Sequence, residues 1–142
     1  MRILVASDGS EHALRAVKYG AEMARLLRTA HNRITLISVH DDAGLRHAKA
    51  VLGEREIADY LRELSENDLK PGSDLLKGAS VEYDMEIRTG HVAQEIVRCA
   101  DEGNFDMIVV GAKGRSAMTD LLIGSVAQRV LATSSKPVVV IK

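Results

Sequence analysis

The chain has 142 residues, of which 46% are hydrophobic and 27% are charged, and its 19 basic and 20 acidic residues leave a formal net charge of −1. This size predicts one domain spanning residues 1–142, and the charge balance argues against a nucleic-acid partner, which would require a basic excess. The single cysteine excludes an internal disulfide framework and suits a reducing compartment, so we expect a cytoplasmic protein. No apolar run approaches the roughly 18 residues of a membrane span, and an acidic residue at position 8 argues against a signal peptide, so no membrane association is expected.

Short apolar runs alternate along the chain with segments of helical periodicity. Continuous apolar runs are typical of strands that are buried on both faces, whereas strict alternation indicates a half-buried strand. The expected strands are 3–6, 34–39, 81–89, 107–110 and 138–141. Apolar residues at helical spacing predict helices over 11–27, 45–64, 91–102 and 126–132.

Two of these segments carry more specific expectations. The run 81–89 alternates, with Val81, Tyr83, Met85 and Ile87 on one side, so it is expected as a half-buried strand at a sheet edge. Segment 67–73 contains a Pro-Gly pair, so it is expected to break the chain between the helix over 45–64 and a further helical turn at 74–77.

The alternation of strands and helices predicts an α/β fold with a parallel sheet and helices on both faces. In such sheets, ligands bind beyond the carboxyl ends of the strands, where the winding reverses. Three polar or glycine-containing segments follow strands in this way: 7–9, 39–41 and the loop that begins at Gly111. We therefore expect any binding site to be assembled from these three segments.

The loop after the fourth strand has the composition of a phosphate-binding loop. Gly111 and Gly114 would let the backbone approach a ligand without Cβ atoms in the way, and Lys113 and Arg115 add positive charge. The following Gly-Ser pair at 124–125 opens a helix, whose free N–H groups and dipole attract anions. The spacings of the P-loop and of the dinucleotide fingerprint are both absent. The residues predict a phosphate site, but they leave the phosphate compound open.

The spacing G-x2-G-x9-G-S from Gly111 to Ser125 resembles the nucleotide motif of the universal stress protein family. Further similarity lies in the start I-L-V-A-S-D-G-S, in G-H-V-A-Q-E-I-V-R-C-A and in the ending K-P-V-V-V-I, and only about 44–78 falls outside it. The resemblance implies a Rossmann-like three-layer sandwich with a five-stranded parallel sheet in the order 3-2-1-4-5. It also implies a homodimer that pairs through the last strand, 138–141, and membership of the ATP-binding branch.

The resemblance further implies which residues contact the nucleotide. They come from the end of the first strand, the end of the second strand, the glycine loop and the start of the following helix: Ala6, Asp8, Val39, Gly111, Lys113, Gly114, Arg115, Ser116, Gly124, Ser125 and Val126. Asp8 also suits a turn or a helix cap, a role compatible with binding ribose. The chain departs from the family at Val92: the family often has a proline two residues after the glycine that matches Gly90.

Together these features predict an ATP-binding regulatory protein of the stress response that acts as a nucleotide-sensing dimer with an unidentified protein partner. We expect little or no hydrolysis and no catalytic residue or protein-based metal site, with Mg²⁺ or Mn²⁺ bound through the phosphates. One alternative is a slow ATPase or phosphotransferase that uses Asp8 or the His40–Asp41 pair. Another is a module that binds AMP or no nucleotide. Residues 40–42 are interpreted as a solvated loop rather than a metal site.

Overall fold

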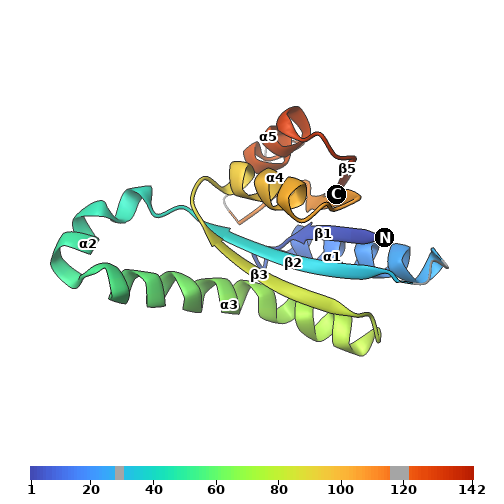
Figure 1. The fold of residues 1–142 in the computed structure, drawn as a ribbon, viewed down its shortest axis with the longest axis horizontal. Coiled ribbons are helices and arrows are strands. Elements are labelled where there is room, and N and C mark those ends of the chain that lie inside the picture. The colour runs from blue at the N-terminus through green and yellow to red at the C-terminus, as the bar shows by residue number, and fades with distance from the viewer. Residues whose placement is uncertain (28–30, 116–121) are drawn as a thin grey trace.

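The computed structural model describes residues 1–27, 31–115 and 122–142, and within them five strands form one parallel sheet (Figure 1). The strand order is β3-β2-β1-β4-β5, which confirms the expected order 3-2-1-4-5. The strands are β1 (Arg2–Ala6), β2 (Arg33–His40), β3 (Tyr83–Thr89), β4 (Met107–Gly111) and β5 (Val138–Ile141). The helical segments are α1 (Glu11–Leu26), the 3₁₀ turn η1 (Ala43–Leu45), α2 (Arg46–Leu52), α3 (Glu54–Gly78), α4 (Val92–Glu102) and α5 (Ser125–Thr133).

Helices cover both faces of the sheet, with α1 and α3 on one face and α4 and α5 on the other (Figure 1). The sequence of the central strand β1 is continuously apolar because the strand is buried on both faces of the sheet. Its residues Ile3 and Val5 pack in the core under α1 and α3, while Leu4 packs in the core under α4 and α5, and all three are fully buried. Ile3 is paired with Ile34 on β2 and with Met107 on β4, so the apolar runs stack across the sheet. Among the described helices, none is both long enough and apolar enough to cross a membrane.

Helix α3 is where the structure departs most from the sequence prediction. The expected break over 67–73 is wrong, because α3 runs without interruption from Glu54 to Gly78 and contains Pro71. The helix buries a long apolar stripe that includes Leu61, Leu69 and Leu76. Gly72 contributes to this packing: a Cβ atom added there would lie 3.2 Å from side-chain atoms of both Leu36 and Val17. Contact with the sheet and α1 therefore outweighs the local preference of Pro and Gly to end a helix.

Replacing Pro71 by alanine should raise the free energy of unfolding by about 1–2 kcal/mol, since proline lacks the N–H that an interior helix position normally donates. Residue 71 is exposed, so alanine fills no core space and removes no buried contact. Urea denaturation of both proteins measures the difference. An unchanged or lower urea midpoint would show that Pro71 does not destabilise α3.

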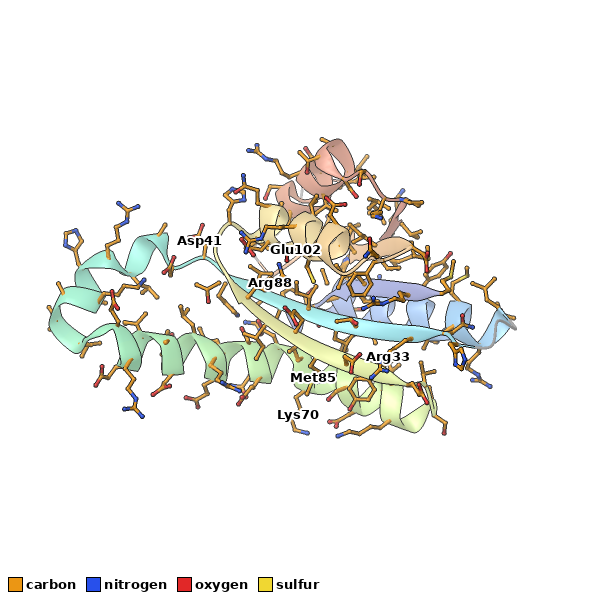
Figure 2. The ribbon with its side chains drawn as sticks, viewed as in Figure 1. Arg33, Asp41, Lys70, Met85, Arg88 and Glu102 are labelled. Carbon is orange, nitrogen blue, oxygen red and sulfur yellow. The ribbon has the colours of Figure 1, made fainter. Side chains whose placement is uncertain are left out.

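Strand β3 forms one edge of the sheet, as expected, and only part of the predicted apolar side of the segment is buried (Figure 2). Val81 and Tyr83 pack against the core, as the alternation predicts, whereas Met85 is 56% exposed and Ile87 is also exposed. The Arg88 guanidinium pairs with Glu86 on the same strand at 3.0 Å and with Glu102 on α4 at 2.9 Å. These ion pairs raise the pKa of Arg88 despite its partial burial, so this side of the strand is held by charges.

Candidate functional site

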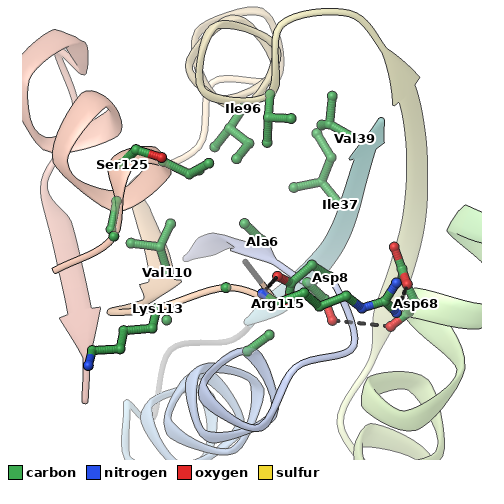
Figure 3. Close-up of a pocket in the computed structure, with 18 of the residues that line it drawn as sticks. Ala6, Asp8, Ile37, Val39, Asp68, Ile96, Val110, Lys113, Arg115 and Ser125 are labelled. Atoms are coloured by element: carbon green, nitrogen blue, oxygen red, sulfur yellow. Dashed lines mark hydrogen bonds and ion pairs between the residues drawn. The ribbon is translucent and has the colours of Figure 1, made fainter. Parts of the chain in front are cut away.

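A cavity of about 460 Å³ lies at the carboxyl ends of β1, β2 and β4 (Figure 3). This volume is within the usual range for small-molecule sites, roughly 300–1,000 Å³. Every predicted binding residue that the structure describes lines the cavity: Ala6, Asp8, Val39, Gly111, Lys113, Gly114, Arg115, Gly124, Ser125 and Val126. The remaining predicted residue, Ser116, lies outside the described residues.

One wall of the cavity is apolar and belongs to the core under α4 and α5. Ile37 and Ile96 are almost completely buried, and Val39 projects beside them from the end of β2 (Figure 3). Val92 also lines this wall, at the position where the family often carries proline. The wall is therefore built from aliphatic side chains that suit the face of a planar, uncharged group.

The two loop glycines are required by contacts within the protein. A Cβ atom added at Gly111 would lie 2.7 Å from the carbonyl carbon of His12, and one added at Gly114 would lie 2.7 Å from Asp8 Oδ2. Neither glycine has a positive φ. The structure therefore gives a packing reason for both glycines, which is separate from the expected close approach of a ligand.

The N-terminus of α5 faces the cavity with Gly124 as its N-cap residue, and no side chain in the described part of the chain caps it. The Gly124 N–H donates to the carbonyl oxygen of Ala112 at 2.6 Å, which fixes the helix start against the glycine loop. Ser125 and Val126 follow as exposed residues of the first turn. Uncapped N–H groups and the helix dipole, together with nearby Lys113, make this end of the cavity attractive to an anion.

Asp8 connects β1 to the glycine loop. Its Oδ1 accepts the Ser10 N–H at 2.9 Å, and its Oδ2 accepts the Arg115 N–H at 3.0 Å. The cap of α1 is provided by Ser10, whose hydroxyl accepts the Ala13 N–H at 3.3 Å. Of the two structural roles considered for Asp8, the structure thus shows the turn, and it adds a contact that holds the loop in place.

Asp68, on α3, is a residue that sequence reasoning missed (Figure 3). Its side chain is only 2% exposed, its Oδ2 lies 2.8 Å from His40 Nε2, and its Oδ1 is paired with the Arg115 guanidinium. The residue falls in the segment 44–78, which the family motif does not cover. The apolar spacing of Leu61, Leu69 and Leu76 would have placed it on the buried side of a helix, had the break over 67–73 not been expected.

The segment 40–42 is only partly the solvated loop that we expected. The Asp41 carboxylate accepts the Ala43 N–H at 2.8 Å, and the hydrogen bond from Lys49 to Asp42 lowers the pKa of the Asp42 carboxyl. His40, by contrast, is half-buried, lines the cavity and pairs with Asp68 rather than with Asp41. Among the described residues, no group of three or more His, Cys, Asp or Glu side chains is arranged to hold a metal ion.

Comparison with known proteins gives consistent matches over the chain. The universal stress protein family model matches residues 1–142. Universal stress protein MJ0531 of Methanocaldococcus jannaschii is 30% identical over 142 residues, which cover 99% of this chain and 81% of that protein. The structure of MJ0577 from the same organism matches with a TM-score of 0.84 and 27% identity, covering 99% of this chain and 94% of that one. A universal stress protein from Archaeoglobus fulgidus, solved in complex with dAMP, is 25% identical with a TM-score of 0.66, covering 100% and 98% of the two chains.

Proposed function

The chain belongs to the universal stress protein family, and we propose that it binds ATP in the cavity as a nucleotide-sensing regulator with little or no hydrolysis. The observation that carries this proposal is the chemical division of the cavity. An aliphatic wall beside Val39 suits a base, and the glycine loop with the start of α5 suits phosphates. The adenine nucleotide in the Archaeoglobus fulgidus relative supports the choice of base, and AMP remains the alternative ligand.

The residues present fit such a ligand. The backbone N–H groups at the start of α5, the Ser125 hydroxyl and the Lys113 ammonium would hold the phosphates, because each is a donor or a positive charge at the same end of the cavity. Mg²⁺ or Mn²⁺ would bind through the phosphate oxygens, as small divalent ions do where few protein carboxylates are available. Ala6 and Val39 would contact the nucleoside.

Slow hydrolysis or phosphotransfer is the second candidate activity, and one observation favours it. His40 is paired with the buried carboxylate of Asp68, and a histidine oriented by a carboxylate is a common arrangement in general acid–base catalysis. His40 directly follows Val39, however, and so lies toward the proposed base end of the cavity. Sustained release of phosphate by pure protein, lost in His40→Gln, would establish this activity in place of sensing.

We also propose that the protein is a homodimer paired through β5. This strand is at the edge of the sheet and pairs with β4 along Val138–Ile141, so its other side offers backbone groups to a second copy. All four of its residues are only half-buried in the single chain. Sedimentation that shows a monomer at every concentration would contradict this arrangement.

ATP with Mg²⁺ should raise the melting temperature of the wild-type protein, since a ligand at about 100 times its Kd adds about 2.7 kcal/mol to the stability of the folded state. Gly114→Val should reduce this shift strongly, because the new Cβ would displace the Asp8 carboxylate that holds the loop. The matched control is Gly44→Val, at a position with no atom within 4 Å of an added Cβ. The measurement is thermal unfolding with and without nucleotide, together with mass spectrometry of any nucleotide that co-purifies.

No shift in the wild-type protein at millimolar ATP would overturn the proposed function. If ATP raised the melting temperature of Gly114→Val and of the wild-type protein equally, ATP binding would stand, but the glycine loop would not be part of the site.

A further inference from the structure

The side of the cavity facing α3 carries a cluster that the proposed function does not use. We define the acidic lip as Asp8, Asp68 and Arg115, which come from the end of β1, from α3 and from the glycine loop. Arg115 joins the two acids, because its backbone N–H donates to Asp8 Oδ2 at 3.0 Å and its guanidinium pairs with Asp68 Oδ1 (Figure 3). A single arginine thus fixes two carboxylates at one edge of the cavity.

The acidic lip is poor in positive charge and rich in hydrogen-bond acceptors. Two carboxylates and one guanidinium sum to a charge of −1, and each carboxylate oxygen can accept about two hydrogen bonds. The guanidinium is not free to serve a phosphate, since its departure would leave Asp68, with a side chain only 2% exposed, without its cationic partner. Leaving a buried charge unpaired is strongly unfavourable. The acidic lip should therefore repel anionic groups and accept hydrogen bonds from hydroxyl groups.

The opposite end of the cavity has the reverse character. Lys113 and Ser125 lie there with the uncapped start of α5, on the other side of the cavity from Asp68 and Arg115 (Figure 3). A nucleoside 5′-phosphate that enters with its phosphates at this donor-rich end and its base on the aliphatic wall brings the sugar between them. The hydroxyl groups are then the donors of the sugar, and in this pose they would face the acidic lip.

We propose that Asp68 is a specificity-determining residue that selects nucleotides with free vicinal sugar hydroxyls and rejects those that carry a phosphate on the sugar. The proposal rests on the proposed function, because it places an adenosine 5′-phosphate in this cavity. Hydroxyl groups donate to carboxylate oxygens in strong, charge-assisted hydrogen bonds. An anionic substituent at the same place would meet the net negative charge of the lip. It could recruit Arg115 only by taking the guanidinium from the buried Asp68 carboxylate, which would then keep only its contact with His40.

The test is calorimetric binding of three ligands to the wild-type protein and to Asp68→Asn. The ligands are adenosine 5′-monophosphate, adenosine 3′,5′-bisphosphate, which adds only a phosphate on the sugar, and 2′,3′-dideoxyadenosine 5′-monophosphate, which lacks both hydroxyls. In the wild-type protein we expect the last two to bind at least about tenfold more weakly than the first. In Asp68→Asn the penalty for the bisphosphate should fall to about threefold or less, because the repelling charge is gone.

The matched control is Asp74→Asn, the same change on the same helix at an exposed carboxylate that pairs with Lys70 at 2.8 Å. It should leave all three ratios unchanged. Tight binding of the monophosphate with the bisphosphate within twofold in the wild-type protein would overturn this proposal alone, as would unchanged ratios in Asp68→Asn. If the wild-type protein bound neither ATP nor any of these three ligands, the proposed function would be overturned as well. Should Asp68→Asn fail to fold, the relative affinities of the three ligands for the wild-type protein can still overturn the proposal.

Discussion

Replacing Gly111 by alanine should lower the free energy of unfolding by about 3 kcal/mol. The added methyl group would meet backbone atoms, so the movement of a side chain alone cannot make room for it. The new Cβ would lie 2.7 Å from the carbonyl carbon of His12 and 2.9 Å from the backbone nitrogen of Ala13. Both contacts are with main-chain atoms in the first turn of α1, so either α1 or the end of β4 must move. Urea denaturation, with the slope compared between the two proteins, measures the loss.

The same movement should reach the cavity. Helix α1 is held in place by buried Ala13, Ala16 and Val17, so the strain is relieved more readily by shifting the glycine loop after β4. We expect the ATP-dependent rise in melting temperature to be reduced in any Gly111→Ala protein that folds. On the proposed function, the first glycine of the motif would therefore affect binding through the position of the loop.

Gly78→Ala is the control for this substitution. Gly78 ends α3, and no atom lies within 4 Å of a Cβ added there, so alanine should leave stability unchanged or raise it by a few tenths of a kcal/mol, up to about 1. If Gly111→Ala were as stable as the wild-type protein, the close approach of β4 to α1 would be wrong.

The arrangement of strands was predictable because the sequence signals it locally. Strands β1, β2, β4 and β5 are apolar runs that stay apolar on both faces, and turn or capping residues such as Ser10 mark where the helices begin. The glycine motif was equally visible, since its function depends on spacing within one segment. The cavity gathers that segment with the ends of β1 and β2, as expected for the carboxyl edge of a parallel sheet.

The parts that escaped prediction depend on contacts between distant segments. Whether α3 continues through Pro71 is decided by the burial of Leu69 and Leu76 against the sheet, which no local pattern states. Asp68 was lost with that break, although it completes the cavity from the α3 side. On β3, the alternation indicated the burial of Tyr83 but did not indicate that Met85 would be exposed or that Arg88 would pair with Glu102 on α4.

Arg115 was assigned to the phosphate-binding loop from its charge and from the family resemblance, and neither of these indicates its contact with α3. In the structure its guanidinium is paired with Asp68, so Arg115→Ala should lower the free energy of unfolding by about 2–3 kcal/mol. This figure is below the usual cost of breaking a fully buried pair, since the Arg115 side chain is 55% exposed and Asp68 keeps its contact with His40. Urea denaturation of the single variants Arg115→Ala and Asp68→Asn and of the double variant gives the coupling between the two residues.

The double variant should recover part of the stability lost in Arg115→Ala, because the buried charge that the arginine compensates has then been removed. A matched control is Arg62→Ala, which breaks an exposed pair with Glu66 on the outer surface of α3 and should cost about 0.5 kcal/mol or less. For nucleotide binding, Lys113→Ala should weaken ATP more than Arg115→Ala does. If Arg115→Ala cost no more stability than Arg62→Ala, yet ATP binding fell more than in Lys113→Ala, Arg115 would be a phosphate ligand, and the acidic lip would lose the residue that joins its two carboxylates.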